Sequence, residues 1–321
     1  MKSIYLATIA AICLLSCGKD SVRTAAPPQE PPHASEPPRA SATPPPPRHN
    51  FSTVLAWCVA PADAVDADER ATLDALRVAM RTDAGDCAAL AAAASAATTI
   101  DLSGKGLKTL GPLASLTQLK TLVATGDPIE DLAPLARLTH LNGLHTDDGT
   151  YASLAPLADL TELETLALAK APVSDLSPLS GLPRLRQLWV YKMPLVDLAP
   201  LMHAQRLQNL YLWDDQIISL APLKGLVGLT DLALSGNQIV DLTPLAELAA
   251  LKGLDIAYQR GVSPLASLAA LSGLPPEALA NLGEKTLFAG NAIAKTTGAC
   301  PTAQGPKTLQ RLCRTYVGLE R

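Results

Sequence analysis

The sequence predicts an α/β solenoid in which each turn of the chain adds one parallel strand and one short helical segment. Three observations support this fold class. A Pro-Leu pair returns at a constant interval, a leucine-rich segment of constant spacing lies between successive prolines, and a residue with a side-chain oxygen stands three places before each proline. Self-similarity at a period of roughly 20 to 50 residues is the signature of repeat architectures, which bury a continuous core by stacking their turns.

The prolines define a 22-residue repeat. Equal intervals separate Pro112, Pro134, Pro156, Pro178, Pro200, Pro222 and Pro244. The next interval, to Pro264, is two places shorter, so the final register is shortened. The composition agrees with a layered core, because 48% of the residues are hydrophobic but only 3% are aromatic. Such a core consists mostly of leucine and alanine, as expected for stacked repeats.

One strand is predicted in each repeat, and its clearest copy reads Leu-x-x-Leu-x-x-Leu-x-Leu from Leu226 to Leu234. The last two leucines of this copy alternate with Asp231, Ala233 and Ser235. Alternation with a period of two is typical of a strand with one buried face. The leucines are therefore expected to point into the core and the intervening residues to point away from it.

The helical segment is predicted to start at the residue with a side-chain oxygen. Asp, Ser or Thr occupies this place in every period, at Thr109, Asp131, Ser153, Asp175, Asp197, Ser219 and Asp241. Such residues cap helical turns by accepting a hydrogen bond from a backbone N–H. The proline that follows lies in the first turn, where its missing N–H costs little.

This 22-residue pattern resembles the leucine-rich repeats of the internalin type, over about residues 98–293. The resemblance implies a leucine-rich-repeat solenoid with a parallel sheet on its concave face and short helical or 3-10 turns on its convex face. It also implies a buried asparagine that bonds to the backbone of neighbouring turns. That place is filled by Lys105, Asp127, Gly149, Ala171, Met193, Asp215, Asn237 and Gln259. Since one of these is asparagine, the ladder is expected to be incomplete.

Residues 1–16 are expected to be a signal peptide. Lys2 precedes a short apolar run from Ile4 to Leu15, which is too short to span a membrane comfortably. The run ends in Leu-Leu-Ser-Cys, which resembles the lipobox of bacterial lipoproteins and implies lipidation of Cys17. The alternative is an ordinary secretory signal with an incidental cysteine. With Gly18 after the cysteine, we expect a lipid-anchored protein of the bacterial cell envelope, at the outer rather than the inner membrane.

Residues 17–50 are predicted to be a tether. Ten of the thirty residues from 21 to 50 are proline, and large apolar residues are almost absent. This composition cannot bury enough surface to fold and favours extended polyproline II. A ligand for a proline-recognition module is the alternative.

The open ends of the solenoid need covers, and helical caps are predicted at both ends. In the N-terminal cap, residues 51–97, Asp66 and Glu69 have the spacing of a capping box. The helix that follows has three apolar residues on one face, Leu73, Leu76 and Met80. A second helix is expected over about 86–97. In the C-terminal cap, residues 294–321, one helix face is formed by Leu309, Leu312, Cys313 and Tyr316.

Four cysteines lie in the two caps. An even number of cysteines in an exported chain indicates disulfides, and we predict Cys58–Cys87 and Cys300–Cys313. Metal binding is the alternative. Neither pair has CxxC spacing or a nearby pair of histidines, so no metal site is predicted.

Two groups of outward-facing residues on the strands are candidates for ligand binding. In two adjacent repeats these residues are large aromatics, Trp189 and Tyr191, then Tyr211 and Trp213. Exposed aromatics on a rigid sheet are typical of interface hot spots, although they also pair across strands to stabilise a sheet. The second group, His145 and Asp147 with Asp148 beside them, is a candidate base or metal site or simply solvated surface.

These features favour a binding protein over an enzyme. The sequence contains no phosphate-binding loop, no G-x-S-x-G motif and no zinc-binding pair, so neither catalytic residues nor a cofactor are predicted. A net charge of −4 argues against nucleic acid as the partner. The expected partner is a protein, a peptide or a glycan held on the concave face, as in a receptor or adhesin. The alternative is a periplasmic or envelope scaffold without an external ligand.

Overall fold

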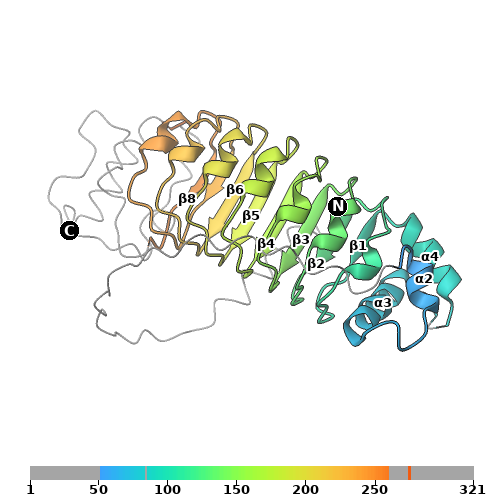
Figure 1. Ribbon diagram of the computed structural model, residues 1–321. Coiled ribbons are helices and arrows are strands. Elements are labelled where there is room, and N and C mark those ends of the chain that lie inside the picture. Colours follow the sequence, from blue (N-terminus) through green and yellow to red (C-terminus); the bar gives the residue numbers. More distant parts are fainter. Residues whose placement is uncertain (1–50, 84, 260–273, 276–321) are drawn as a thin grey trace, which may run out of the picture. The chain divides into compact units, whose positions relative to one another are not determined.

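The computed structural model describes residues 51–83, 85–259 and 274–275 (Figure 1). The signal peptide, Cys17, the tether over 17–50, the C-terminal cap over 294–321 and the Cys300–Cys313 pair lie outside the described residues. The same holds for nearly all of the predicted repeat region after residue 259. Those features remain predictions.

The repeats form one sheet of eight described strands, all parallel and ordered as in the sequence (Figure 1). The strands are β1 (Thr99–Asp101), β2 (Thr121–Ala124), β3 (Gly143–Asp147), β4 (Thr165–Ala169), β5 (Gln187–Tyr191), β6 (Asn209–Trp213), β7 (Asp231–Ala233) and β8 (Gly253–Asp255). Residues that pair between neighbouring strands stand one repeat apart in the sequence, as Leu166 and Leu188 do. The predicted leucine-rich-repeat solenoid is therefore confirmed.

The return segment of each repeat is a short 3-10 helix. These are η1 (Gly111–Leu113), η2 (Ala133–Arg137), η3 (Ala155–Leu157), η4 (Ser177–Gly181), η5 (Ala199–His203), η6 (Ala221–Leu223) and η7 (Thr243–Glu247). In all seven, the predicted Asp, Ser or Thr side chain accepts a hydrogen bond of 2.7 to 3.3 Å from the backbone N–H two residues later. A leucine separates this side chain from the helix, as Leu242 does before η7. The helix therefore begins two residues later than predicted, and the side-chain bond closes a turn just before it instead of capping it.

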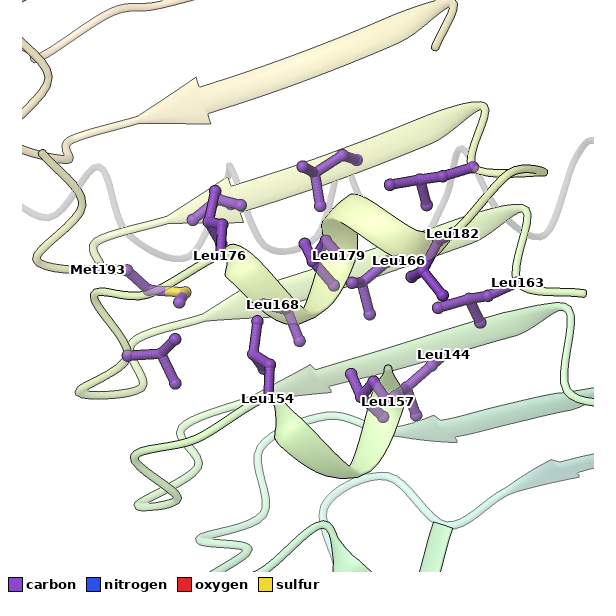
Figure 2. Close-up of a cluster of buried hydrophobic side chains, with 14 of the residues drawn as sticks. Leu144, Leu154, Leu157, Leu163, Leu166, Leu168, Leu176, Leu179, Leu182 and Met193 are labelled. Carbon is purple, nitrogen blue, oxygen red and sulfur yellow. The ribbon is translucent and has the colours of Figure 1, made fainter. Parts of the chain in front are cut away.

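The core is a stack of leucines contributed by both parts of the repeat. Figure 2 shows Leu144 and Leu166 on strands facing Leu157 and Leu179 on the 3-10 turns. These four side chains have exposed fractions of 1% or less. Because each turn repeats the same leucines, the core continues through the described repeats as one cluster.

The asparagine position connects neighbouring repeats through four of its eight residues. Asn237 Oδ1 accepts from the Ile217 N–H at 3.2 Å, and its Nδ2 donates to the carbonyl oxygens of Leu212 and Leu234 at 2.8 Å each. Asp127, Asp215 and Gln259 likewise accept a backbone N–H from the preceding repeat. The ladder is therefore incomplete, as expected.

A carboxylate at this position accepts hydrogen bonds but cannot donate the two that the Asn237 amide makes. Asp127 Oδ1 accepts from the N–H groups of Lys105 and Leu107, but its Oδ2 is buried without a hydrogen-bond partner among the described residues. An amide there would donate to backbone carbonyls as Asn237 does. We expect Asp127→Asn to raise the free energy of unfolding by about 1 kcal/mol, measured by urea denaturation. Asn237→Asp should lower it, and a loss of stability in Asp127→Asn would contradict this account.

Three helices cover the N-terminal end of the sheet (Figure 1): α2 (Val54–Val59), α3 (Ala67–Met80) and α4 (Cys87–Ala96). The predicted capping box is confirmed, because Asp66 Oδ1 accepts from the Glu69 N–H and Glu69 Oε2 accepts from the Asp66 N–H. The predicted second helix is α4. The short α2 was not predicted. Thr72 Oγ1 joins α3 to the first repeat by donating to the Thr109 carbonyl oxygen at 2.7 Å.

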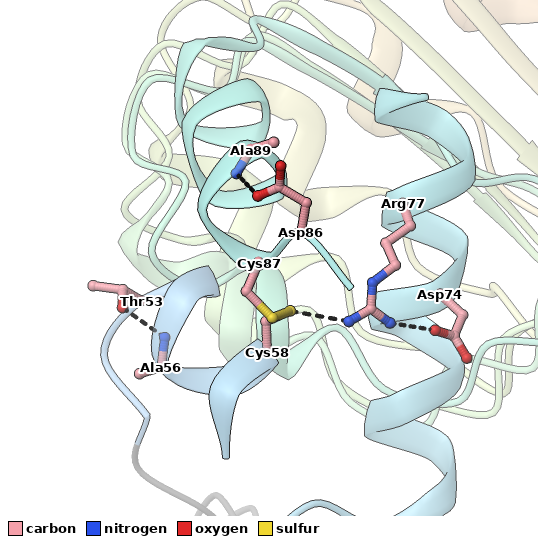
Figure 3. Close-up of a disulfide and its surroundings, with 8 residues drawn as sticks. All are labelled: Thr53, Ala56, Cys58, Asp74, Arg77, Asp86, Cys87 and Ala89. Carbon is pink, nitrogen blue, oxygen red and sulfur yellow. Dashed lines mark hydrogen bonds and ion pairs between the residues drawn. A yellow bond between two sulfur atoms is a disulfide. The ribbon is translucent and has the colours of Figure 1, made fainter. Parts of the chain in front are cut away.

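The Cys58–Cys87 disulfide is confirmed and joins α2 to α4 (Figure 3). Arg77 of α3 lies beside it, with Nη2 2.9 Å from Cys58 Sγ and Nη1 2.5 Å from Asp74 Oδ1. The disulfide therefore ties α2 to α4 at the point where Arg77 of α3 contacts it.

Removal of this disulfide should destabilise the cap. The two cysteines are 29 residues apart, and closing a loop of that length removes about 3 to 4 kcal/mol of chain entropy from the unfolded state. We expect Cys58→Ser/Cys87→Ser to lose about that much stability in urea. The effect should appear first in the helical signal of the cap, because the turns of a repeat protein are coupled mainly to their neighbours. A loss below about 1 kcal/mol would show that cap packing alone closes the loop.

Candidate functional site

The candidate site lies on the outer face of the sheet, which we define as the face opposite the leucine core. In β5 and β6 the inward residues are buried, whereas Trp189, Tyr191, Tyr211 and Trp213 on the outer face are partly exposed. The strand register places Trp189 beside Tyr211 and Tyr191 beside Trp213, as predicted. The two repeats thus present four aromatic side chains in one compact area.

Three of these rings form a continuous stack. The centroids of Trp189 and Tyr211 are 5.7 Å apart with an interplanar angle of 11°, and those of Tyr211 and Trp213 are 5.2 Å apart at 28°. Trp213 therefore turns onto the tyrosine of its own strand, and Tyr211 is the middle ring. We call Trp189, Tyr211 and Trp213 the aromatic stack.

The strands on both sides of the aromatic stack carry small residues. On β4 the outward residues next to it are Ala167 and Ala169, and on β7 the residue in register with Tyr211 is Ala233. The aromatic stack is therefore flanked by alanines on β4 and β7.

Tyr191, the fourth outward aromatic residue, contacts the side chain of Lys192. The Lys192 ammonium nitrogen is 5.0 Å from the centre of the Tyr191 ring, which is within the range of a cation–π interaction.

A row of polar side chains runs beside the aromatic stack. Gln187 Nε2 donates to Asn209 Oδ1 at 3.3 Å, and Asn209 Nδ2 donates to Asp231 Oδ2 at 2.9 Å. Thr230 Oγ1 donates to the same carboxylate oxygen at 2.9 Å. These residues were not among the predicted site residues. The signal that could have identified them is an amide or carboxyl group at the same outward place in three successive repeats.

The row and the stack interact electrostatically. Burial raises the pKa of the Tyr211 hydroxyl, and the negative charge of Asp231 raises it further, while a hydrogen bond with Asn209 opposes the shift. Tyr211 is therefore a neutral phenol at physiological pH, next to a carboxylate.

His145 and Asp147, the second predicted group, are nearly buried on β3, with exposed fractions of 8% and 7%. Burial raises the pKa of Asp147, although its carboxylate accepts a hydrogen bond from the Gly126 N–H. Burial also lowers the pKa of His145, which favours the neutral imidazole. The His145 ring lies 6.3 Å from that of Trp189, across Ala167. His145 is therefore a mostly neutral ring next to the aromatic stack.

The described residues contain neither a candidate metal site nor a candidate membrane-spanning helix. Within 51–83, 85–259 and 274–275, no three His, Cys, Asp or Glu side chains are grouped so that they could hold a metal ion. In the same residues no helix has the length and apolar character needed to cross a membrane.

Comparison with known proteins relates the chain to internalins of Listeria monocytogenes through its structure. No family model and no curated protein matches the sequence. An internalin, InlF, from Listeria monocytogenes strain 4b F2365 is 26% identical at a TM-score of 0.57, over 65% of this chain and 61% of that one. Internalin C2 from the same strain is 26% identical at a TM-score of 0.56, over 64% and 90%. The fold is internalin-like. The functional domain of InlJ from L. monocytogenes shares the fold at 19% identity and a TM-score of 0.50, over 63% and 48%.

The chain thus spans less than two thirds of the length of InlF and of InlJ. Internalin-like leucine-rich-repeat folds typically bind proteins and are generally non-catalytic. The fold does not specify the ligand, because one repeat architecture serves many partners.

Proposed function

We propose that this chain is a non-catalytic receptor or adhesin that binds a protein or peptide on the outer face of its sheet, around the aromatic stack. The observation that carries the proposal is the stack itself, three large rings that stay partly exposed on a rigid sheet. Trp and Tyr dominate the energetics of protein interfaces, since each buries a large area and has few rotatable bonds to fix.

The stability of the sheet does not explain the stack. The outward residues of β4, two of which are alanine, stand in the same places and keep the same register with β3 and β5. Partly exposed aromatic area gains most of its free energy only when a partner covers it.

A display experiment tests the proposal. A phage library of random dodecapeptides is selected on the purified full chain, with Trp189→Ala/Trp213→Ala as the counter-selection target. We expect families of peptides that bind the wild-type chain and not the variant. Peptides that bind both chains equally would overturn the proposed site.

We further propose that the binding domain is anchored in the bacterial envelope by lipid on Cys17, with residues 18–50 as its tether. The motif at the end of the apolar run supports this. Lipid on the cysteine would bind a membrane durably when more than one acyl chain is attached. The anchor and the aromatic stack are independent of one another, so each is tested separately.

The lipid anchor predicts a change in partitioning. We expect the wild-type chain expressed in a bacterial host to incorporate labelled palmitate and to enter the detergent phase of Triton X-114, whereas Cys17→Ala does neither. Cys58→Ser is the control and should keep the label. Labelling of Cys17→Ala would refute the anchor, and protease shaving of intact cells would distinguish a surface receptor from a periplasmic scaffold.

A further inference from the structure

The outer face carries a single sign of charge at the outward places of the eight described strands. The charged side chains there are Asp101, Asp147, Asp231 and Asp255, and none of these places holds lysine or arginine. Lys192 and Lys252 flank the strands and do not occupy them. Asp231 lies on β7, next to the aromatic stack, and Asp255 lies on β8, one strand further away.

The strand register arranges these groups around one small residue. Ala233 of β7 pairs with Tyr211 on one side and with Asp255 on the other. Asp231 stands two residues before Ala233 on the same strand. Adjacent strands are about 4.8 Å apart, so the backbone positions of Tyr211 and Asp255 are separated by roughly 10 Å, with Ala233 between them. We call Tyr211, Asp231, Ala233 and Asp255 the Ala233 site.

The Asp231 carboxylate extends over a glycine of the next strand. Gly253 of β8 pairs with Asp231. A Cβ at position 253 would lie 2.6 Å from Asp231 Oδ1, so a side chain there would displace the carboxylate. Both carboxylates are partly exposed. Asp231 is held in position by Asn209 and Thr230, which donate to its Oδ2.

We propose that the Ala233 site receives an arginine or lysine side chain of the protein partner, between the aromatic stack and the two carboxylates. A guanidinium group is flat, stacks on aromatic rings and forms paired hydrogen bonds with carboxylates. The chain already uses this chemistry on the same face, where Lys192 lies over the Tyr191 ring. The two carboxylates also favour a basic group of the partner at this point of the face.

This inference rests on the proposed function, and two changes test it separately. Peptides selected as described above should share an arginine or lysine. Replacing the arginine of a selected peptide with citrulline, which keeps the shape and removes the charge, should weaken binding to the wild-type chain about tenfold. Asp231→Asn should weaken the arginine peptide to a similar extent while barely changing the citrulline peptide, because asparagine keeps the oxygen that Asn209 and Thr230 bond to.

Asp159→Asn is the matched control, since it removes the same charge from an exposed residue after η3, away from the outer face. It should leave both affinities unchanged. Selected peptides that require Trp189 and Trp213 but show no basic residue, or that tolerate citrulline, would overturn the cation site and leave the proposed function standing. Binding that is indifferent to the tryptophans would instead overturn the proposed function.

Discussion

The Trp189→Ala/Trp213→Ala chain should bind a selected peptide or the natural partner at least about 100-fold more weakly than the wild-type chain. Each truncated aromatic hot spot costs about 2 kcal/mol or more of binding free energy, and about 1.4 kcal/mol corresponds to a tenfold change in Kd. The two tryptophans are the outer members of the aromatic stack, so their loss removes both ends of the surface offered to a partner. Isothermal titration calorimetry measures the change.

The same double replacement should lower the free energy of unfolding by about 1 to 3 kcal/mol. A stacked aromatic pair contributes about 0.5 to 1.5 kcal/mol beyond its burial, and two such contacts are lost. Small residues already occupy these places on β4, so the strands keep their register.

Trp57 provides the matched control, because it is the chain's third tryptophan and is 4% exposed in the N-terminal cap. Trp57→Ala should lower stability by about 3 to 5 kcal/mol and leave the affinity of the folded chain unchanged. If the double replacement on the sheet lost stability like Trp57→Ala and kept its affinity, the stack would be a stabilising feature of the sheet and not a binding site.

The repeat made the fold predictable from the sequence. A 22-residue period determines which residues pair between strands, so the sequence alone predicts that Trp189 lies beside Tyr211. The capping box at Asp66 and the Cys58–Cys87 disulfide were equally predictable, since both follow from local spacing or cysteine number. The period-two pattern also indicated which residues of β5 and β6 would be partly exposed, but on β3 the outward residues are buried as well.

What the sequence did not predict depends on side-chain conformation or on short segments. Six residues are too few for α2 to show a helical period. Strand register cannot specify that Trp213 stacks on Tyr211 of its own strand. The burial of His145 was missed because strand alternation alone predicts that an outward residue is exposed. The Ala233 site was missed because no single repeat contains it.

The third repeat departs from the consensus by a linked exchange of residues. The asparagine position holds Gly149, and two residues later Tyr151 replaces the aliphatic residue found at Ile239. The Tyr151 ring occupies the space next to Gly149, so that a Cβ at 149 would clash with Tyr151 Cε1 and lie 2.7 Å from Cδ1. The ring is buried, and its hydroxyl bonds with Thr146 Oγ1 at 2.7 Å. Burial raises the pKa of this hydroxyl to about 12, which keeps it protonated.

A double-mutant cycle should therefore show strong coupling between the two positions. Gly149→Asn alone should lower stability by about 3 kcal/mol, because the new side chain overlaps a buried ring that cannot move away. Tyr151→Ile alone should lower it by about 2 to 3 kcal/mol through the cavity and the lost Thr146 hydrogen bond. Together they rebuild the pair seen at Asn237 and Ile239.

We expect the double variant to be about 3 kcal/mol more stable than the sum of the single effects predicts, measured by urea denaturation. Adding Thr146→Leu should recover more stability, because leucine removes the buried hydroxyl that Tyr151 satisfied and is the residue at the equivalent place in Leu168 and Leu212. Additive effects would mean that Gly149 and Tyr151 are independent. The Tyr151 hydroxyl bonds to Thr146, which is a residue of β3 and the neighbour of His145. A change in the environment of His145 in these variants would therefore show that core packing affects the outer face of β3.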